Sequence, residues 1–343
     1  MSKLTEVLKL FCYDPETDGA NTFNIPKALN ENWEKIDAAI APLDGATTAQ
    51  AALAALGAGV RPNLLDNAYF VGGGTGYGTF PVNQKGRLSG NTDRQFICDR
   101  WNQFGSDWSL TKDGLVISKR SDAEYWSFFQ LIPVELLSQL VGKTATVSVL
   151  FDDSLVTVTQ ILSSPITYFS FENGERAEIY IPDDDTVGAV QYYGSTTTRT
   201  VKAIKFEIGT AQTLAYQDAD GAWRLLPQPE RDYATQLAKC QAYYWENNGF
   251  SLNENDYIMT AGDNKFIKTN IMFPAQMNRI PTVTITSING TPGILSNWQD
   301  RTDSDIQAVV NPSSLTKSGF ENIMSPNWVN GNYSFRVIAN TGL

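Results

Sequence analysis

Histidine is absent from all 343 residues of the chain. This absence excludes every catalytic triad, general base and metal site that depends on an imidazole. The sequence also contains no G-x-S-x-G, H-E-x-x-H, C-x-x-C or P-loop motif. The glycine-rich run at residues 72–78 is not followed by a helix-forming pattern, so it indicates a loop rather than a dinucleotide site. We therefore expect a protein without a catalytic residue, an obligatory metal ligand or a cofactor.

Positive charge is scarce as well. The chain has 26 Lys and Arg against 37 Asp and Glu, which gives a formal net charge of −11. A chain this acidic is repelled by a phosphate backbone, so nucleic-acid binding is not expected. No segment reaches the roughly 18 consecutive apolar residues of a membrane span, so membrane insertion is not expected either.

Cysteine is rare, and the three residues Cys12, Cys98 and Cys240 lie far apart in the sequence. The first residues show no basic segment followed by an apolar run, so we expect no secretion signal. These features favour buried thiols in a protein made in a reducing cytoplasm. An acidic protein that is made there but acts outside the cell fits a particle released by lysis.

Aromatic residues, by contrast, are plentiful, with 8 Trp, 14 Tyr and 17 Phe. Together with many Asn, Thr, Ser and Gly they favour β-structure with polar loops. A chain of this length also exceeds one ordinary core. We predict a mainly β protein: a short N-terminal helical segment (1–61), then two β-sandwich or jelly-roll-like domains (62–230 and 231–343), the second opened by a linking helix.

Narrow apolar stripes at helical spacing mark the N-terminal segment. One runs from Leu4 to Phe11 and a second from Ile25 to Ile40, and a short Ala-rich helix is predicted at 47–57. Stripes this narrow bury little surface by themselves. The segment is therefore expected to associate with other copies or to dock on a larger assembly.

Short β patterns separated by turn residues fill residues 63–230. The predicted strands cover residues 108–118 with a hairpin turn at 112–114, 125–132, 143–151, 177–181, 187–193 and 200–208. Between them, residues 133–141 have the pattern of one short helix. Alternation at residues 200–208 predicts a strand that is buried on one face only.

The PQPER stretch at 227–231 marks the clearest internal boundary. After it, Tyr233, Leu237, Cys240 and Tyr244 fall on one face of a predicted helix. Further strands are predicted near residues 267–273, 282–286 and 333–339. Between them lie two long polar connections, at residues 287–305 and 311–332.

Several short motifs, taken in order, resemble those of bacteriophage tail-fibre and receptor-binding proteins. Near the N-terminus stand LNENWEKID (29–37) and TTAQAALAALG (47–57). The first β-domain contains NLLDNAYF (63–70), VNQKG (82–86), DRW (99–101) and VKAIKFEIGTAQTLAY (201–216). The last domain contains LAKCQAYYW (237–245), the FPxxMxxxPTV pattern (273–283), GF (319–320) and YxFxxxA (333–339).

This resemblance implies a place in a virion. In that family the N-terminal segment attaches to the tail tip or baseplate, fibres are usually trimeric, and a β tip domain binds the host surface. The central sandwich is similar to a carbohydrate-binding module in architecture. The chain is thus expected to be a homo-oligomer, the trimer usual in the family, held by residues 1–61 to tail or baseplate proteins. It is expected to bind a host surface glycan or another receptor through residues 231–343. A structural baseplate or neck component and a glycan-cleaving tailspike remain alternatives.

Acidic residues leave two chemical alternatives open. Asp183, Asp184 and Asp185, with Asp152 and Asp153, have oxygen ligands suited to Ca²⁺, but their spacing is not that of an EF-hand. A pair of carboxylates is what a glycosidase needs, yet no pair is marked by its sequence context. Acidic loops that simply face water remain the simpler interpretation.

Two tryptophans in the polar connections are the candidate ligand-binding positions. Sugars stack on aromatic faces while neighbouring amides and carboxylates bond their hydroxyls. The candidate residues are Asn297, Trp298, Asp300, Asn327, Trp328 and Asn330. The alternative is that each tryptophan packs in the core or in a subunit interface.

Overall fold

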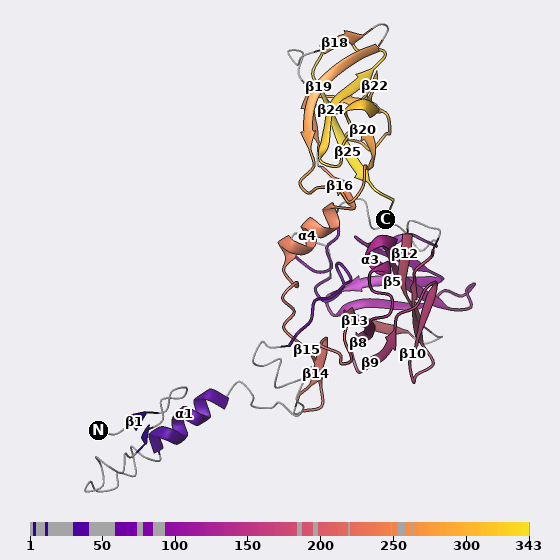
Figure 1. The fold of residues 1–343 in the computed structure, drawn as a ribbon. Coiled ribbons are helices and arrows are strands. Elements are labelled where there is room, and N and C mark those ends of the chain that lie inside the picture. Colours follow the sequence, from indigo (N-terminus) through magenta and orange to yellow (C-terminus); the bar gives the residue numbers. More distant parts are fainter. Residues whose placement is uncertain are drawn as a thin grey trace. The chain divides into compact units, whose positions relative to one another are not determined.

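The structure is a computed structural model. It describes residues 3–4, 11–12, 30–40, 59–73, 78–84, 93–183, 187–194, 198–218, 220–247, 249–252, 258–261 and 264–342. The chain divides into two compact units, residues 1–61 with 213–228 and residues 62–212 with 229–343. Figure 1 labels helices and strands of both. Within these ranges, no helix has the length and apolar character that crossing a membrane requires. The predicted mainly β fold is confirmed.

The first unit contains short elements. Helix α1 (Glu31–Ile40) lies within the second predicted stripe. The prediction of a helix from Leu4 to Phe11 is wrong for these two end residues, because β1 (Lys3–Leu4) pairs as a strand with β2 (Phe11–Cys12). The predicted helix at 47–57 lies outside the described residues. Strands β14 (Ala215–Gln217) and β15 (Trp223–Leu225) form a hairpin that also belongs to this unit.

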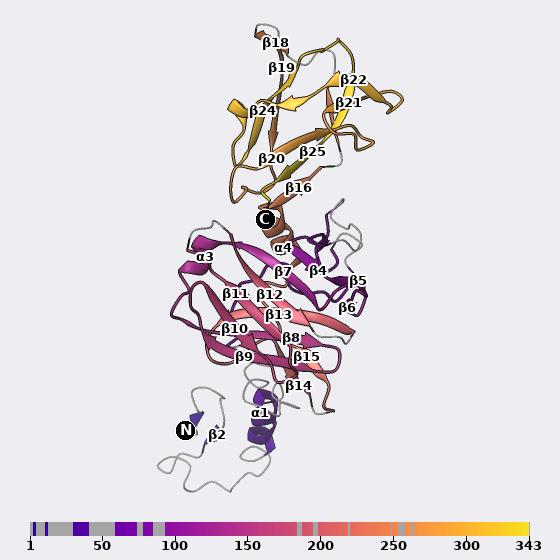
Figure 2. The ribbon, with the colours of Figure 1, turned by 90° about the vertical axis from the view of Figure 1, so that its right-hand side faces the viewer.

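The central domain is a sandwich of two antiparallel sheets. The first has the strand order β10-β11-β12-β7-β4-β3 and the second β5-β6-β13-β8-β9. The strands of the first sheet are β3 (Phe96–Cys98), β4 (Trp101–Phe104), β7 (Trp126–Pro133), β10 (Ile166–Ser170), β11 (Arg176–Tyr180) and β12 (Val187–Gly194). Those of the second are β5 (Ser106–Thr111), β6 (Gly114–Lys119), β8 (Thr144–Phe151), β9 (Leu155–Ile161) and β13 (Arg199–Ile208). Figure 2 shows β7, β12, β11 and β10 side by side.

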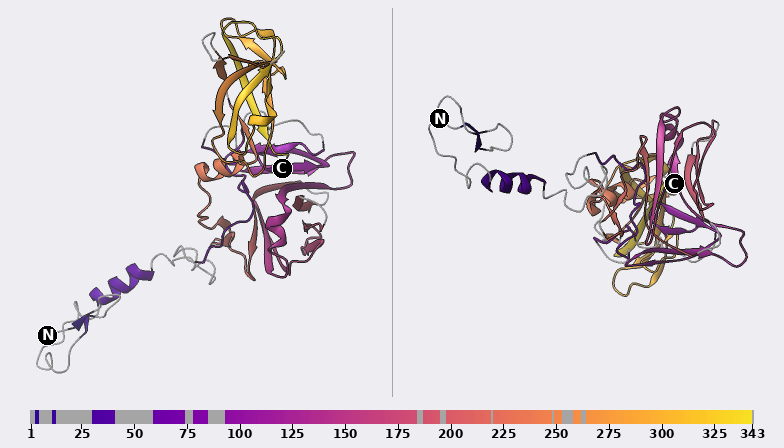
Figure 3. Two further views of the ribbon diagram at one scale, coloured as in Figure 1. Left: turned by 45° about the horizontal axis from the view of Figure 1, so that its top comes forward. Right: turned by 90° about the horizontal axis from the view of Figure 1, so that it is seen from below.

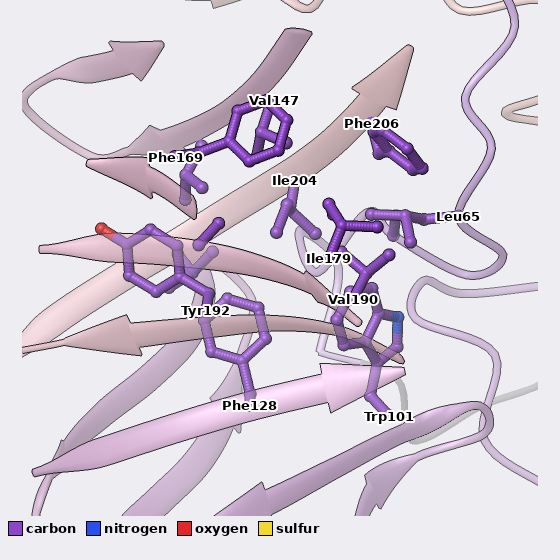
Figure 4. Packing of buried hydrophobic residues seen from close by; sticks show 14 of the residues in the cluster. Leu65, Trp101, Phe128, Val147, Phe169, Ile179, Val190, Tyr192, Ile204 and Phe206 are labelled. Atoms are coloured by element: carbon purple, nitrogen blue, oxygen red, sulfur yellow. The ribbon is translucent and has the colours of Figure 1, made fainter. Parts of the chain in front are cut away.

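Both sheets contribute to one apolar core. Phe128, Val190 and Tyr192 come from the first sheet, and Val147 and Phe206 from the second (Figure 4). On β7 and β12 every second residue is buried, so the alternate side chains point away from the core. That outward face of the first sheet is described below. Helix α3 (Val134–Ser138) follows β7 and lies within the helix predicted at 133–141, but it is shorter, and Pro133 is its N-cap instead of a residue of its first turn.

Strand β13 departs from the sequence-based expectation. Lys205 and Glu207, on the face predicted to meet solvent, are fully buried, and their side chains pair at 3.9 Å. Along one edge, residues 64–70 bond to the strand: the Leu64 N–H donates to the Phe206 carbonyl at 2.8 Å. The prediction of a half-buried strand is therefore wrong, because burial here comes from a distant part of the chain.

The C-terminal domain begins with helix α4 (Tyr233–Gln241), as predicted. Strand β25 (Tyr333–Asn340) pairs with β16 (Tyr244–Glu246), β17 (Phe250–Leu252), β20 (Thr282–Thr286) and β21 (Ile294–Asn297), and β21 pairs with β22 (Asp303–Gln307). A second sheet contains β18 (Ile258–Ala261), β19 (Asn264–Met272), β24 (Gly319–Ser325) and β23 (Val309–Val310). Figure 3 (left) shows these orange-to-yellow strands gathered in one domain.

The two long polar connections expected in this domain are partly regular structure. Strand β21 and the first residues of β22 lie within residues 287–305. A short 3₁₀ turn (Pro312–Ser314) and β24 lie within residues 311–332. The expectation of uninterrupted loops is thus wrong. The remaining turn between β21 and β22 carries Trp298.

Candidate binding surfaces

The outward face of the first sandwich sheet carries aromatic side chains in register. One row runs across four neighbouring strands, β11, β12, β7 and β4, and consists of Arg176, Tyr193, Ser127 and Phe104 in that order. The next row places Gln191 between Glu178 and Phe129. A third row places Ala189 between Tyr180 and Leu131. The face an antiparallel sheet turns outward is normally polar, so this pattern is unusual.

The apolar and aromatic members of these rows, with Gln191, line a groove of about 650 Å³. The small residues Gly188 and Ala189 line it, together with the rings of Tyr125, Phe104, Tyr193 and Tyr180. The lining follows β12 from Val187 to Tyr193, a length of about 20 Å at the usual rise per residue. The groove is therefore long enough for an extended ligand.

Aromatic contacts fix the rings at one end of the groove. Tyr125 stacks on Phe104 with ring centroids 5.9 Å apart and touches Tyr193 at 5.4 Å. Tyr125 nevertheless keeps 37% of its surface exposed, and Tyr180 keeps 41%. A ring that is packed on one side and open on the other offers a preorganised stacking surface.

Polar groups beside these rings are held by hydrogen bonds. The Gln191 amide donates to the Ser127 hydroxyl at 2.9 Å. The Arg176 guanidinium lies 4.4 Å above the Tyr193 ring and pairs with Glu178 at 2.7 Å. Burial, and next a hydrogen bond with Glu178, raise the pKa of Tyr193, so its hydroxyl stays neutral at physiological pH. Arg94 is the one charged side chain among the described residues that line the groove.

This chemistry suits a neutral, hydroxylated ligand with apolar faces. Exposed rings stack on the C–H faces of a sugar, and amides exchange hydrogen bonds with its hydroxyls. Sequence reasoning missed the groove. A signal was present, because both alternate sets of side chains on 126–133 and 187–193 are rich in apolar and aromatic residues.

Trp298, the first of the two candidate tryptophans, lies in the turn after β21 and is 47% exposed. With Asn297, Asp300 and Tyr333 it lines a pocket of about 340 Å³. The Asp300 carboxylate accepts hydrogen bonds from the Thr302 N–H at 3.0 Å and the Thr302 hydroxyl at 2.7 Å. Those two bonds lower the pKa of Asp300, which keeps a negative charge beside the indole.

The other candidate residues are placed differently. Trp328 is only 3% exposed and packs edge-on against Tyr333 at 5.0 Å, so the core-packing alternative holds for it. An indole buried in this way has no free face for a sugar. Asn327 bonds within the domain, donating to the Asp305 carbonyl at 2.6 Å. Asn330 is exposed, and it is not among the described residues that line the Trp298 pocket. Binding by Asn297, Trp298 and Asp300 stays a prediction.

The acidic candidates do not assemble in the described part of the chain. Asp183 accepts a hydrogen bond from the Ser164 hydroxyl at 2.6 Å, and Asp153 accepts one from Ser154 at 2.8 Å. Asp184 and Asp185 lie outside the described residues. Among the residues that are described, no three His, Cys, Asp or Glu side chains come close enough together to hold a metal ion.

Comparison with known proteins yields only weak likenesses. The chain matches no protein-family model and no curated protein. Among solved structures it is similar to discoidin II of Dictyostelium discoideum, with 11% identity over 75% of this chain and 87% of that one and a TM-score of 0.20. It is also similar to a glycoside hydrolase family 81 enzyme from Clostridium thermocellum, with 10% identity over 82% of this chain and 41% of that one and a TM-score of 0.11. Scores this low define neither fold nor function, so the surfaces above are interpreted from their own chemistry.

Proposed function

We propose that this chain is a receptor-binding protein of a bacteriophage tail or a phage-derived tail particle, that its receptor is a host surface glycan, and that it acts without catalysis. The observation that carries the proposal is the groove on the outward face of the first sandwich sheet. Its exposed tyrosines and its fixed Gln191 amide form a surface that fits sugar rings. The sequence motifs supply the tail-fibre assignment.

In this proposal the groove is the main glycan site. The Trp298 pocket of the C-terminal domain is a second contact, where an exposed indole stands beside the Asp300 carboxylate. Residues 1–61 attach the chain to the tail or baseplate, and three copies associate. Three copies would offset weak binding at single sites through avidity.

Binding to an array of bacterial surface polysaccharides tests the proposal. The purified full-length chain is expected to bind a subset of neutral polysaccharides and to release no reducing sugar from them. Reducing-sugar release would point to a tailspike enzyme instead. A complete lack of binding, on the array and to cells, would favour a structural baseplate component.

Oligomeric state is tested separately. Multi-angle light scattering is expected to give three times the chain mass of 37.9 kDa. Removal of residues 1–61 is expected to reduce association with the particle while the sandwich stays folded. A single-chain mass for the full-length protein would contradict the trimer.

A further inference from the structure

Three motifs that lie far apart in the sequence meet at one place in the structure. They are NLLDN (63–67), DRW (99–101) and residues 239–243, which include the end of α4 and the two residues after it. The Trp101 indole donates to the Asp66 and Asn67 carbonyls at 3.1 and 3.0 Å. The Asn67 N–H donates to the Gln236 side chain of α4 at 2.6 Å. The glycan groove does not involve these motifs, and their meeting point has a cavity of its own.

Arg100 is the unusual residue at this place. Its side chain is 1% exposed, and its guanidinium lies 3.4 Å over the Tyr243 ring. Nη2 donates to the Leu131 carbonyl at 2.7 Å. Within the described part of the chain, Nε and Nη1 have no hydrogen-bond partner. A buried guanidinium with unused donors is costly, which makes it a sign of a missing acceptor.

The charges that line the cavity do not balance. The Asp66 carboxylate lies 3.5 Å from Arg100 Nε and 3.4 Å from Lys239 Nζ, both beyond a good charge-assisted hydrogen bond. Asp66 is the single acid among the described residues that line the cavity, against these two cations. The lining groups therefore carry one excess positive charge, and the buried carboxylate of Asp99 lies outside the lining. An anionic acceptor would compensate this excess charge.

The cavity itself is small and partly apolar. Its volume is about 270 Å³, and Leu64, Ile132 and Leu136 line it beside the charged groups. Leu136 is 54% exposed and Leu64 38% exposed, so the opening is reachable from solvent. A space of this size admits one sugar ring and is too small for a strand or a helix.

From these observations we propose a second ligand site, in which Arg100 and Lys239 bind the carboxylate of an acidic monosaccharide unit such as a uronic acid. The carboxylate forms an ion pair with the accessible Lys239 ammonium and is attracted by the positive charge of the buried Arg100 guanidinium. The apolar side chains contact the ring. The site is separate from the neutral-glycan groove and goes beyond the function proposed above.

Isothermal titration of the full-length chain with D-glucuronate, D-glucose and N-acetylglutamate amide tests this site. Saturable binding of glucuronate, at least tenfold tighter than glucose, is the expected result. Equal binding of the two sugars, or no binding of glucuronate, overturns the proposal. Tighter binding of the blocked glutamate overturns it in favour of an acidic peptide.

Two variants leave Arg100 and its structural bonds untouched. Lys239→Gln removes one cation, and Leu136→Trp fills the opening from an exposed position on α3. Each is expected to weaken glucuronate binding at least fivefold, whereas Lys143→Gln, at an exposed lysine outside the cavity, is expected to leave it unchanged. Unchanged binding in both test variants overturns the site. The groove variant Tyr125→Ala is expected to bind glucuronate normally, which separates this proposal from the first.

Discussion

Asn67 is predicted to be one of the most sensitive positions for the stability of the sandwich. It is fully buried, and its side-chain oxygen accepts a hydrogen bond from the Val82 N–H at 2.6 Å. Its side-chain nitrogen donates to the Val82 and Asp99 carbonyls, both at 2.8 Å. Its backbone has a φ of 53°, in the left-handed region that asparagine tolerates better than alanine does.

The expected cost of Asn67→Ala follows from these contacts. Three buried hydrogen bonds at about 1 kcal/mol each, and about 1 kcal/mol for alanine in the left-handed region, give a loss of about 4 kcal/mol. Such a loss is a large part of the roughly 5–15 kcal/mol by which domains are stable. Asn67→Gly keeps the backbone freedom and is expected to lose about 3 kcal/mol, which isolates the contribution of the hydrogen bonds.

Native-state hydrogen exchange with mass spectrometry measures this loss on sandwich peptides alone, apart from the C-terminal domain. Amides of β7 and β12 are expected to exchange faster in Asn67→Ala. Asn330→Ala, at an exposed residue, serves as the control and is expected to change stability by less than about 0.5 kcal/mol. A loss below about 1 kcal/mol in Asn67→Ala would refute the reasoning.

Three further predictions concern other parts of the chain. Trp328→Ala is expected to lower the free energy of unfolding by roughly 3–5 kcal/mol because the indole is only 3% exposed. Trp298→Ala is expected to change it by less than about 0.5 kcal/mol because that indole is 47% exposed, and thermal unfolding of both variants checks the two values. Cys98 and Cys240 carry buried thiols, and burial raises the pKa of Cys240. In a Cys12→Ser background these two thiols are expected to react with a disulfide reagent only as the protein unfolds, and fast reaction in native buffer would contradict this. Asp232 is the N-cap of α4, and hydrogen bonds from the Thr235 N–H and hydroxyl lower the pKa of its carboxyl group. The ionised cap therefore stabilises the folded state above a pH of about 4, and this stabilisation is lost as the pH falls through the lowered pKa. The stability difference between the native chain and Asp232→Ala is therefore expected to shrink on going from pH 7 to acid, and a constant difference would count against this.

Local patterns predicted the elements that depend on neighbouring residues. Lys112 and Asp113 form the turn between β5 and β6, as their turn chemistry indicates. Helix α3 lies within the predicted range 133–141, although Pro133 is its N-cap and not part of its first turn. Strands β8 and β25 likewise fall where alternation places them. Each of these features depends on a few consecutive residues.

Features set by distant contacts could not be predicted from the sequence. The burial of Lys205 depends on what covers β13, and residues 64–70 bond to that strand from far away in the chain. The groove needs the register of four strands, which places Tyr180, Ala189 and Leu131 in one row. Trp298 and Trp328 have similar sequence surroundings, but Trp328 is buried and packs edge-on against the Tyr333 ring, whereas Trp298 is exposed.

The account depends most on the groove as a glycan site. The deciding measurement is the affinity of the full-length chain for a neutral bacterial polysaccharide that it binds, compared between Tyr125→Ala and Tyr216→Ala. Tyr125 lines the groove, whereas Tyr216 lies on the β14–β15 hairpin outside it. Loss of one stacking ring, worth about 1.4 kcal/mol, is expected to weaken binding about tenfold in Tyr125→Ala, with Tyr216→Ala unchanged. Undiminished binding by Tyr125→Ala in a folded protein would contradict the account.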